Sequence, residues 1–262
     1  MRLLEPNKIH AYLKQFNFKT PYTLHCLSTI DSSNRYLNEL PPNPKLIFCC
    51  VEEQTAGRGR FGRTWHSPFG ENIYCSGRWR LNHDLKDISG LSLVVGLAII
   101  ESLKNYAGEE TILIKWPNDL MWKNKKLGGI LIELNNQHHG IIDLTIGIGL
   151  NVNSQQHAMA LSDKPWCSLL QMTGDVLDRN PLIAGIIVYL DSYLSQFLTL
   201  GFIAFKTAWD KVDYLKNQWI TVSEPQRTLS GYAQGVTTQG LLCLKDNKNV
   251  IHYITSGEAS LS

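Results

Sequence analysis

The chain has 262 residues, of which 44% are hydrophobic and 18% are charged. That is the composition of an ordinary globular protein, so a disordered chain and a collagen-like repeat are excluded. The 25 Lys and Arg residues nearly balance the 23 Asp and Glu residues, which leaves a formal charge of +2. No whole-chain basic field therefore attracts a polyanion, and nucleic-acid binding would need a local patch. At about 100–200 residues per domain, the length predicts one large domain and one small domain.

The sequence also bears on compartment and redox state. Residues 1–6 lack the apolar stretch of a secretory signal peptide. The most apolar stretch, residues 91–100, is interrupted by Ser92 and Gly96, and it is shorter than the roughly 20 residues that a membrane span requires. We therefore expect a cytoplasmic protein with no membrane partner. The six cysteines show neither a CxxC pair nor metal-ligand spacing with histidine, which predicts reduced, mostly buried thiols and no protein-bound metal.

Apolar spacing in the first half of the chain predicts helices that alternate with strands. The helix-capping residues 31–34 precede a short helix, and Pro41 and Pro42 follow it. The predicted elements are helix 5–16, strand 22–27, helix 35–40, strand 45–52, strand 72–81 and helix 87–106, with a loop rich in glycine and arginine at 54–70.

The second half of the chain predicts four strands, two helices and then a group of short strands. Pro181 takes the favoured first position of a helix that follows the capping sequence 179–181. Residues 153–165 are polar and aperiodic, which predicts a mobile loop. The predicted elements are strands 111–115, 120–123, 127–134 and 141–150, turns 123–126 and 138–140, a helix from the cap to about 198, helix 203–212, and strands 219–222, 228–236, 241–244 and 250–255. The last group predicts a small β-barrel.

The sequence GRGRFGRTW at residues 57–65 carries the first sign of chemistry. It matches GxGxxG after a strand, but proline and glycine follow closely and the next element is a strand, so the Rossmann interpretation fails. No GK[ST] follows the glycines, which excludes a Walker A loop. The glycines let the backbone approach a ligand, and Arg58, Arg60 and Arg63 supply guanidinium groups suited to carboxylate and phosphate oxygens. Taken alone, the sequence also fits a solvated basic loop or an RGG-like RNA-binding segment.

Three further motifs each have a functional and a structural interpretation. Residues 115–120, KWPNDL, carry a charged pair around a Pro-Asn turn, which is also a common structural corner. Residues 126–131, KLGGIL, place a lysine at a strand start with two glycines behind it, where nothing bulky blocks a ligand. Alternatively, Lys126 is a solvent-exposed residue of a hairpin whose charge only keeps the protein soluble. Residues 147–153, GIGLNVN, end a strand with small residues and two amides, and an edge strand with a bulge also fits them.

In their order and spacing, the four motifs resemble those of the biotin protein ligases, the enzymes that join biotin to a carboxylase carrier protein. The resemblance runs from about residue 29 to residues 257–261, which is nearly the whole chain. It implies an α+β fold with a class II synthetase-like catalytic domain at residues 1–217, in which helices back a mixed β-sheet. A small SH3-like β-barrel would follow at residues 218–262.

The resemblance also implies the reaction and its partners. The enzyme would use ATP and Mg²⁺ to activate biotin as biotinyl-5′-AMP, and would then transfer biotin to a lysine of the biotin carboxyl carrier protein of acetyl-CoA carboxylase. Many bacterial members carry an N-terminal helix-turn-helix domain, whereas only a short segment precedes the first predicted strand here. We therefore expect the monofunctional type, with no nucleic-acid partner. The sequence leaves a homodimer open.

The family motifs assign roles by position. Hydroxyl and amide groups are the neutral partners that a ureido ring needs, and the cationic side chains suit a carboxylate and phosphates. The expected catalytic residues are Lys126, Arg60 and Asp119. The expected biotin contacts are Ser32, Ser33, Asn34, Gln54, Gly57, Arg58, Gly59, Arg60, Lys126, Gly128 and Gly147. The expected ATP and adenylate contacts are Arg58, Arg60, Arg63, Trp65, Lys115, Asn118, Lys126, Asn151 and Trp166.

Two of these assignments carry alternatives. Asp119 either receives the ammonium group of the carrier lysine or has a structural role, in which it holds Lys115 or the Asn118 turn in place. Trp166 lies 15 residues after Asn151, which is the family spacing for a tryptophan that stacks on adenine from a ligand-ordered loop. The loop sequence between them differs from the family pattern.

Two rival functions remain for comparison. A lipoate–protein ligase or octanoyltransferase belongs to the same superfamily, but GRGR, KWPND and the Ser-Ser-Asn set together favour biotin with its polar ring. An RNA-binding module built on the arginine loop and the barrel would need aromatic residues spaced for base stacking. Beyond Phe61 and Trp65 the loop lacks them.

Overall fold

A computed structural model of the chain describes residues 2–41, 43, 45–82, 88–108, 110–138, 141–155 and 165–261. The larger part is a seven-stranded sheet with strand order β1-β2-β3-β7-β6-β5-β4. The strands are β1(Tyr22–Ile30), β2(Leu46–Gln54), β3(Ile73–Asn82), β4(Leu113–Lys115), β5(Asp119–Trp122), β6(Lys125–His138) and β7(Ile141–Leu150). β1 pairs with β2 in parallel, and every other neighbouring pair is antiparallel. The predicted mixed sheet is therefore confirmed.

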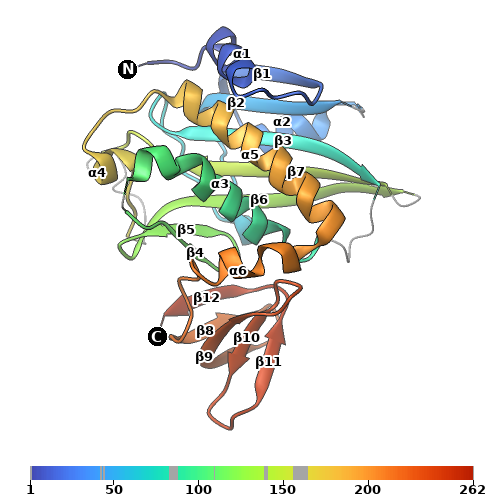
Figure 1. The fold of residues 1–262 in the computed structure, drawn as a ribbon, viewed down its shortest axis with the longest axis vertical. Helices are drawn as coiled ribbons and strands as arrows, with labels where there is room; N and C mark the ends of the chain where they lie inside the picture. The colour runs from blue at the N-terminus through green and yellow to red at the C-terminus, as the bar shows by residue number, and fades with distance from the viewer. Residues whose placement is uncertain are drawn as a thin grey trace.

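Helices cover both faces of this sheet. On one face, α3(Leu91–Ala107) and α5(Arg179–Leu200) pack on each other and on the strands, and α1(Pro6–Gln15) packs on α5; Figure 1 shows α3 and α5 crossing the sheet. On the other face, α2(Ser33–Glu39) packs on β2 and β3 through the buried Leu37. The predicted backing of the sheet by helices is confirmed, and α2 brings its polar first turn to the sheet.

The length and apolar composition of α5 would suffice for a membrane span. Half of its most apolar window is buried, however, and Leu182, Ile186, Leu190 and Leu194 belong to the main hydrophobic core. Those are the properties of a core helix, in which the apolar face packs on neighbouring elements.

The C-terminal part is a separate five-stranded antiparallel sheet with order β11-β10-β9-β8-β12, at the end of the molecule away from α1 in Figure 1. Its strands are β8(Trp219–Ser223), β9(Thr228–Val236), β10(Leu242–Lys245), β11(Ile251–Ile254) and β12(Glu258–Leu261). The sheet meets the larger part where Trp116 Nε1 donates to the Gly240 carbonyl at 3.4 Å. Gly240 has φ of 80°, and a Cβ there would lie 2.6 Å from Gly90 Cα, so this contact requires glycine.

Several predicted boundaries were wrong, for local reasons. The helix at 179 is capped by the Asp178 carboxylate, which accepts from Asn180 N–H, so Pro181 is its third residue and not its first. The turn between β5 and β6 takes two residues, because Lys123 and Asn124 both adopt positive φ, and β6 begins at Lys125.

The predicted helix 203–212 was also wrong, since it divides into the 3₁₀ turn η4(Phe202–Phe205) and α6(Lys206–Trp209). Phe202 and Phe205 are buried three residues apart, a spacing that suits a 3₁₀ turn. The chain then leaves the helix because the Val212 carbonyl accepts from Ile114 N–H at 2.7 Å. Sequence periodicity also missed α4(Leu169–Thr173) and β12.

Two other predictions lie mostly outside the described residues: the loop 153–165 at 156–164, and the turn 138–140 at 139–140. All six cysteines are free thiols and four of them are buried, as predicted.

Candidate active site

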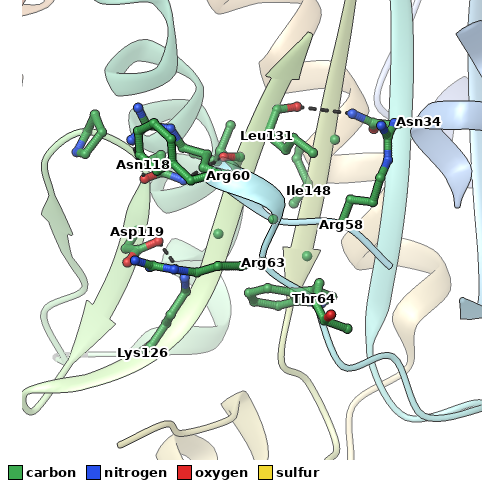
Figure 2. Close-up of a pocket in the computed structure, with 18 of the residues that line it drawn as sticks. Asn34, Arg58, Arg60, Arg63, Thr64, Asn118, Asp119, Lys126, Leu131 and Ile148 are labelled. Carbon is green, nitrogen blue, oxygen red and sulfur yellow. Dashed lines mark hydrogen bonds and ion pairs between the residues drawn. The ribbon is translucent and has the colours of Figure 1, made fainter. Parts of the chain in front are cut away.

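One cavity brings together the four sequence motifs, the first turn of α2 and the edge of the C-terminal sheet. Its floor is formed by glycines and apolar residues of β6 and β7, the arginine loop 57–65 lies above them, and Glu258 and Ala259 of β12 contribute from the smaller sheet. In Figure 2, Asn34 and Arg58 lie on one side of the cavity, while Asp119, Lys126 and Arg63 lie on the other. The predicted residues that line it are Ser32, Ser33, Asn34, Gln54, Arg58, Gly59, Arg60, Arg63, Trp65, Lys115, Asn118, Asp119, Lys126 and Gly147.

The first side of the cavity is polar and neutral. Ser32, Ser33 and Asn34 are all buried at the N-terminus of α2, where Ser32 is the N-cap. Ser33 is held by Gln54 Oε1, which accepts from its backbone N–H at 2.9 Å. Asn34 rests directly on Gly147, where a Cβ would come within 2.2 Å of Asn34 Oδ1. The glycine in GIGLNVN therefore makes room for a polar side chain, which an edge strand with a bulge would not require.

The arginine loop is closed on itself by backbone hydrogen bonds. Gly59 N–H donates to the Arg63 carbonyl at 2.6 Å, and Trp65 N–H donates to the Gly57 carbonyl at 2.8 Å. The Trp65 ring then packs on the sheet, where a Cβ at Gly149 would lie 2.4 Å from Trp65 Cε2. Because the indole occupies the space above this glycine, the loop is seated on β7.

The second side of the cavity is cationic. Arg60 Nη1 donates to the Gly257 carbonyl at 3.1 Å, and it lies 3.4 Å from Asn118 Oδ1. Burial lowers the pKa of the Arg60 guanidinium, and the nearby Asp119 carboxylate partly offsets that effect. Lys126 Nζ is 2.6 Å from Asp119 Oδ1, and it lies 5.3 Å from the centroid of the Trp65 ring.

Arg58 lies beside Asn34 on the first side of the cavity (Figure 2). Its Nη2 donates to Glu133 Oε2 at 2.8 Å, and its Nε is buried with no hydrogen-bond partner among the described residues. Arg63 pairs with Glu258 of β12. A buried donor without a partner is costly, so Arg58 Nε is suited to a ligand oxygen.

Comparison with known proteins agrees with this geometry. Residues 27–153 match the Biotin/lipoate A/B protein ligase family, and residues 217–262 match the Biotin protein ligase C terminal domain. The chain is 35% identical, over its whole length, to the bifunctional ligase/repressor BirA of Salmonella typhimurium, 79% of which it covers. This chain belongs to the biotin protein ligase family. It is thus a member of a family of enzymes with a class II synthetase-like fold.

Two further biotin protein ligases show how closely the chain follows the family. The Aquifex aeolicus biotin protein ligase, solved in complex with biotin and ATP, superposes with a TM-score of 0.78 at 28% identity. That match covers 92% of this chain and 98% of the other. The biotin–[acetyl-CoA-carboxylase] ligase of Paracoccus denitrificans is 28% identical over 84% of this chain and 92% of its own length.

Four residues expected as biotin protein ligase contacts do not line the cavity: Gly57, Gly128, Asn151 and Trp166. The two glycines serve close packing, since a Cβ would lie 2.4 Å from the Trp65 carbonyl oxygen at Gly57 and 2.9 Å from the Gly149 carbonyl oxygen at Gly128. Gly59, which was predicted, and Gly129, which was not, both line the cavity.

Asn151 and Trp166 act on the backbone of Lys126 in this structure. Asn151 is buried, and its Nδ2 donates to the Cys167 carbonyl at 3.0 Å and lies 3.4 Å from the Lys126 carbonyl. Trp166 forms an isolated bridge with Lys126, and the adjacent residues 156–164 lie outside the described part of the chain. Asp119 pairs with Lys126, a partner that neither sequence alternative for Asp119 included.

Sequence reasoning missed several residues at the site of this biotin protein ligase. Ser76 and Glu133 face the neutral side from β3 and β6, and Glu258 reaches the cationic side from the other sheet. A strand directs successive side chains to opposite faces, but that geometry alone does not show which polar side chain of β3 or β6 meets the cavity. Nothing in the sequence indicated that β12 would return to Arg63.

Proposed function

We propose that this chain activates biotin to biotinyl-5′-AMP with ATP and transfers biotin to a lysine of the biotin carboxyl carrier protein of acetyl-CoA carboxylase. The observation that carries the proposal is the division of one cavity into a neutral polar side, with Ser33, Asn34 and Gln54, and a cationic side, with Arg60 and Lys126. A ureido ring needs neutral hydrogen-bonding partners, whereas a carboxylate and a triphosphate need cations. Biotin and ATP together present those groups.

The first step joins two anions. A biotin carboxylate oxygen attacks the α-phosphorus of ATP, the bond to the bridging oxygen of pyrophosphate breaks, and pyrophosphate leaves. The obstacle is electrostatic repulsion, and Arg58, Arg60 and Lys126 offset it with positive charge held in position before the reaction. Burial of Arg60 strengthens its interaction with an anion, because a low local dielectric weakens screening.

The Mg²⁺ in this proposal accompanies the ATP phosphates. Within the described ranges no group of three or more His, Cys, Asp and Glu side chains is arranged to hold a metal ion. Phosphate oxygens and water are ordinary Mg²⁺ ligands, so a dedicated protein cage is not required. The bound ion would neutralise charge on the departing pyrophosphate.

In the second step the ε-amino group of a carrier lysine attacks the carbonyl carbon of the mixed anhydride, and AMP leaves. The lysine must first lose a proton, and Asp119 is a carboxylate that lines the cavity. Its present partner Lys126 would turn to the substrate phosphate, which frees Asp119 to accept the proton that the carrier lysine loses. The name of the Paracoccus denitrificans relative supports acetyl-CoA carboxylase as the source of the carrier. We place the reaction in the cytoplasm, without a nucleic-acid partner.

The test is an assay of each step with purified protein. Biotin-dependent exchange of pyrophosphate into ATP is expected, and labelled biotin should appear on the carrier domain but not on a carrier whose acceptor lysine is replaced by arginine. Lipoate and octanoate are the matched controls, because the family match includes lipoate ligases. Exchange that depends on lipoate or octanoate and not on biotin would overturn the proposal.

A further inference from the structure

Two side chains outside the predicted set, Glu133 and Ser76, set the direction of the hydrogen bonds on the neutral side of the cavity. Glu133 Oε2 accepts from Asn34 Nδ2 at 2.8 Å, from Arg58 Nη2 at 2.8 Å and from Asn38 Nδ2 at 3.4 Å. Ser76 is buried, and its Oγ lies 2.6 Å from Asn34 Oδ1 and 2.7 Å from Ser33 Oγ. Figure 2 shows Asn34 and Arg58 side by side, with the Asn34 amide also directed at the Leu131 carbonyl.

The orientation of the Asn34 amide follows from its neighbours. A carboxylate and a backbone carbonyl can only accept hydrogen bonds. The Asn34 atom that faces Glu133 Oε2 at 2.8 Å and the Leu131 carbonyl at 3.4 Å must therefore be the NH₂ group. The amide oxygen is left facing Ser76. Glu133 thus decides which end of a buried amide meets the serine.

The serine protons are then fixed in turn. Ser76 has one hydroxyl proton, and it must go to Asn34 Oδ1, because two oxygen atoms 2.6 Å apart repel each other without a proton between them. Ser76 Oγ consequently accepts from Ser33. Ser33 Oγ also lies 3.0 Å from Gln54 Oε1, to which it can donate the same single proton, so that proton stays between oxygens of this network and none is left for the cavity. Gln54 Oε1 still accepts from Ser33 N–H.

With its proton committed, Ser33 Oγ presents only lone pairs to the cavity. Asn34 Oδ1 likewise has a second lone pair, and both residues line the cavity. This side of the site is therefore an acceptor surface, which matches a ligand ring that carries N–H groups. Arg58 Nε, a buried donor without a partner among the described residues, supplies the complementary donor beside it.

We propose that Glu133, acting through Asn34 and Ser76, is a positioning residue that holds the neutral side of the cavity in its proton-accepting form and so selects the two N–H groups of the ureido ring. This inference rests on the proposed function, since it names the recognition of biotin within it. Neither Glu133 nor Ser76 reacts with substrate.

The experiment measures biotin binding by calorimetry without ATP, and ATP binding separately. Glu133→Leu removes the acceptor and leaves the Asn34 amide free to turn. Glu133→Gln can keep its carbonyl oxygen at the Oε2 position, where all three donors meet, so it retains the polarity without the charge. Asp143→Leu is the matched control, because Asp143 is another half-buried carboxylate of this sheet, paired with Arg80 at 3.8 Å and outside the cavity lining.

We expect Glu133→Leu to raise the Kd for biotin about tenfold or more and the Kd for ATP much less, although the variant also removes the partner of Arg58. Glu133→Gln should stay within about threefold of wild type, and Asp143→Leu should bind biotin normally. Ser76→Ala should weaken biotin binding as Glu133→Leu does, and the double variant should lose little more than either single change, because both break the same chain. An analogue methylated on one ureido nitrogen should be rejected less strongly by Glu133→Leu than by wild type.

Equal losses in Glu133→Gln and Glu133→Leu would overturn the inference, since they would assign the effect to charge alone. Parallel losses of biotin and ATP binding would also overturn it, by pointing to a general structural role. If Glu133→Leu does not fold, normal biotin binding by Ser76→Ala overturns the inference by itself. A wild-type protein that does not bind biotin at all would instead refute the proposed function.

Discussion

Lys126 Nζ on β6 and Asp119 Oδ1 on β5 lie 2.6 Å apart at the cavity. Asp119 begins β5 and Lys126 follows at the start of β6, and the register between the two strands shifts after Leu120. Because of that irregularity the two side chains lie on the same face of the hairpin. The positive charge of the lysine is therefore compensated in this structure and becomes available when an anionic substrate competes with Asp119.

The first prediction concerns Lys126→Ala. Biotin-dependent pyrophosphate exchange should fall about a hundred- to a thousandfold, because a cation aimed at the reacting phosphate acts mainly on the transition state. The Kd for biotin should change much less. Lys125→Ala is the control, since Lys125 is the preceding residue on the strand and is absent from the cavity lining. Near-normal exchange in Lys126→Ala would remove this lysine from the reaction.

The second prediction concerns Arg60, which connects the arginine loop to Asn118 and to the Gly257 carbonyl. Arg60→Gly should still form the adenylate, since Arg58 and Lys126 remain, but should release it about ten- to a hundredfold faster. Free biotinyl-5′-AMP acylates exposed lysines, so the variant should label serum albumin while the parent labels only its carrier.

Arg60→Lys serves as the comparison for this second prediction, because it keeps the charge and loses the forked geometry of the guanidinium. It should leak less adenylate than Arg60→Gly. If Arg60→Gly yields neither adenylate nor labelled albumin, Arg60 acts in the first chemical step and not in retention of the intermediate.

Local patterns predicted the parts of the fold that local forces determine. The strand predicted at residues 141–150 is β7 with the same bounds, and the small residues noted in GIGLNVN include Gly147 and Gly149, which leave room for Asn34 and Trp65. The end of the predicted helix 203–212 escaped prediction because the chain leaves the helical path where the Val212 carbonyl accepts from Ile114 N–H, and the two residues are far apart in the chain. Periodicity carries no information on such a pairing.

The candidate site likewise contains residues that the sequence indicated and residues that it did not. Arg58 and Lys126 stood out because their glycine-rich surroundings are unusual for a structural loop. Glu133 and Ser76 did not, because a polar residue within a strand is ordinary until its partners are known. Glu258 lies on a strand that periodicity missed, and its place beside Arg63 depends on how the two sheets meet.

The third prediction tests the contact between Arg63 of the arginine loop and Glu258 of the C-terminal sheet. Glu258→Ala removes the partner of Arg63, and Ala259 beside it lines the same cavity. Because Arg63 is about half exposed, we expect a modest effect, a rise of about three- to tenfold in the KM for ATP with the Kd for biotin unchanged. Glu224→Ala is the control, since it breaks an ion pair with Arg227 in the turn between β8 and β9, and neither residue lines the cavity. A KM for ATP equal to that of wild type would show that this contact does not help to hold ATP.

The fourth prediction uses the contact between Gly147 and Asn34. In Gly147→Ala the new methyl group would lie 2.2 Å from Asn34 Oδ1 and 2.9 Å from Asn34 Cγ, so the amide must move. The Asn34 bonds to Ser76 and Glu133 would break, and the Kd for biotin should rise at least about tenfold. Gly185→Ala is the control.

A Cβ at Gly185 would meet only Ser102 Cβ at 3.8 Å, an ordinary contact between α5 and α3, so alanine there should leave biotin binding intact. It should also stabilise the helix by about 0.5–1 kcal/mol, because glycine is the weaker helix former. The thermal unfolding temperatures of both variants show whether Gly147→Ala only displaces the Asn34 side chain or also destabilises the sheet. If Gly147→Ala binds biotin as tightly as Gly185→Ala, then the position of the Asn34 amide does not determine biotin affinity, and the neutral side of the cavity recognises its ligand through Ser33 and Gln54 alone.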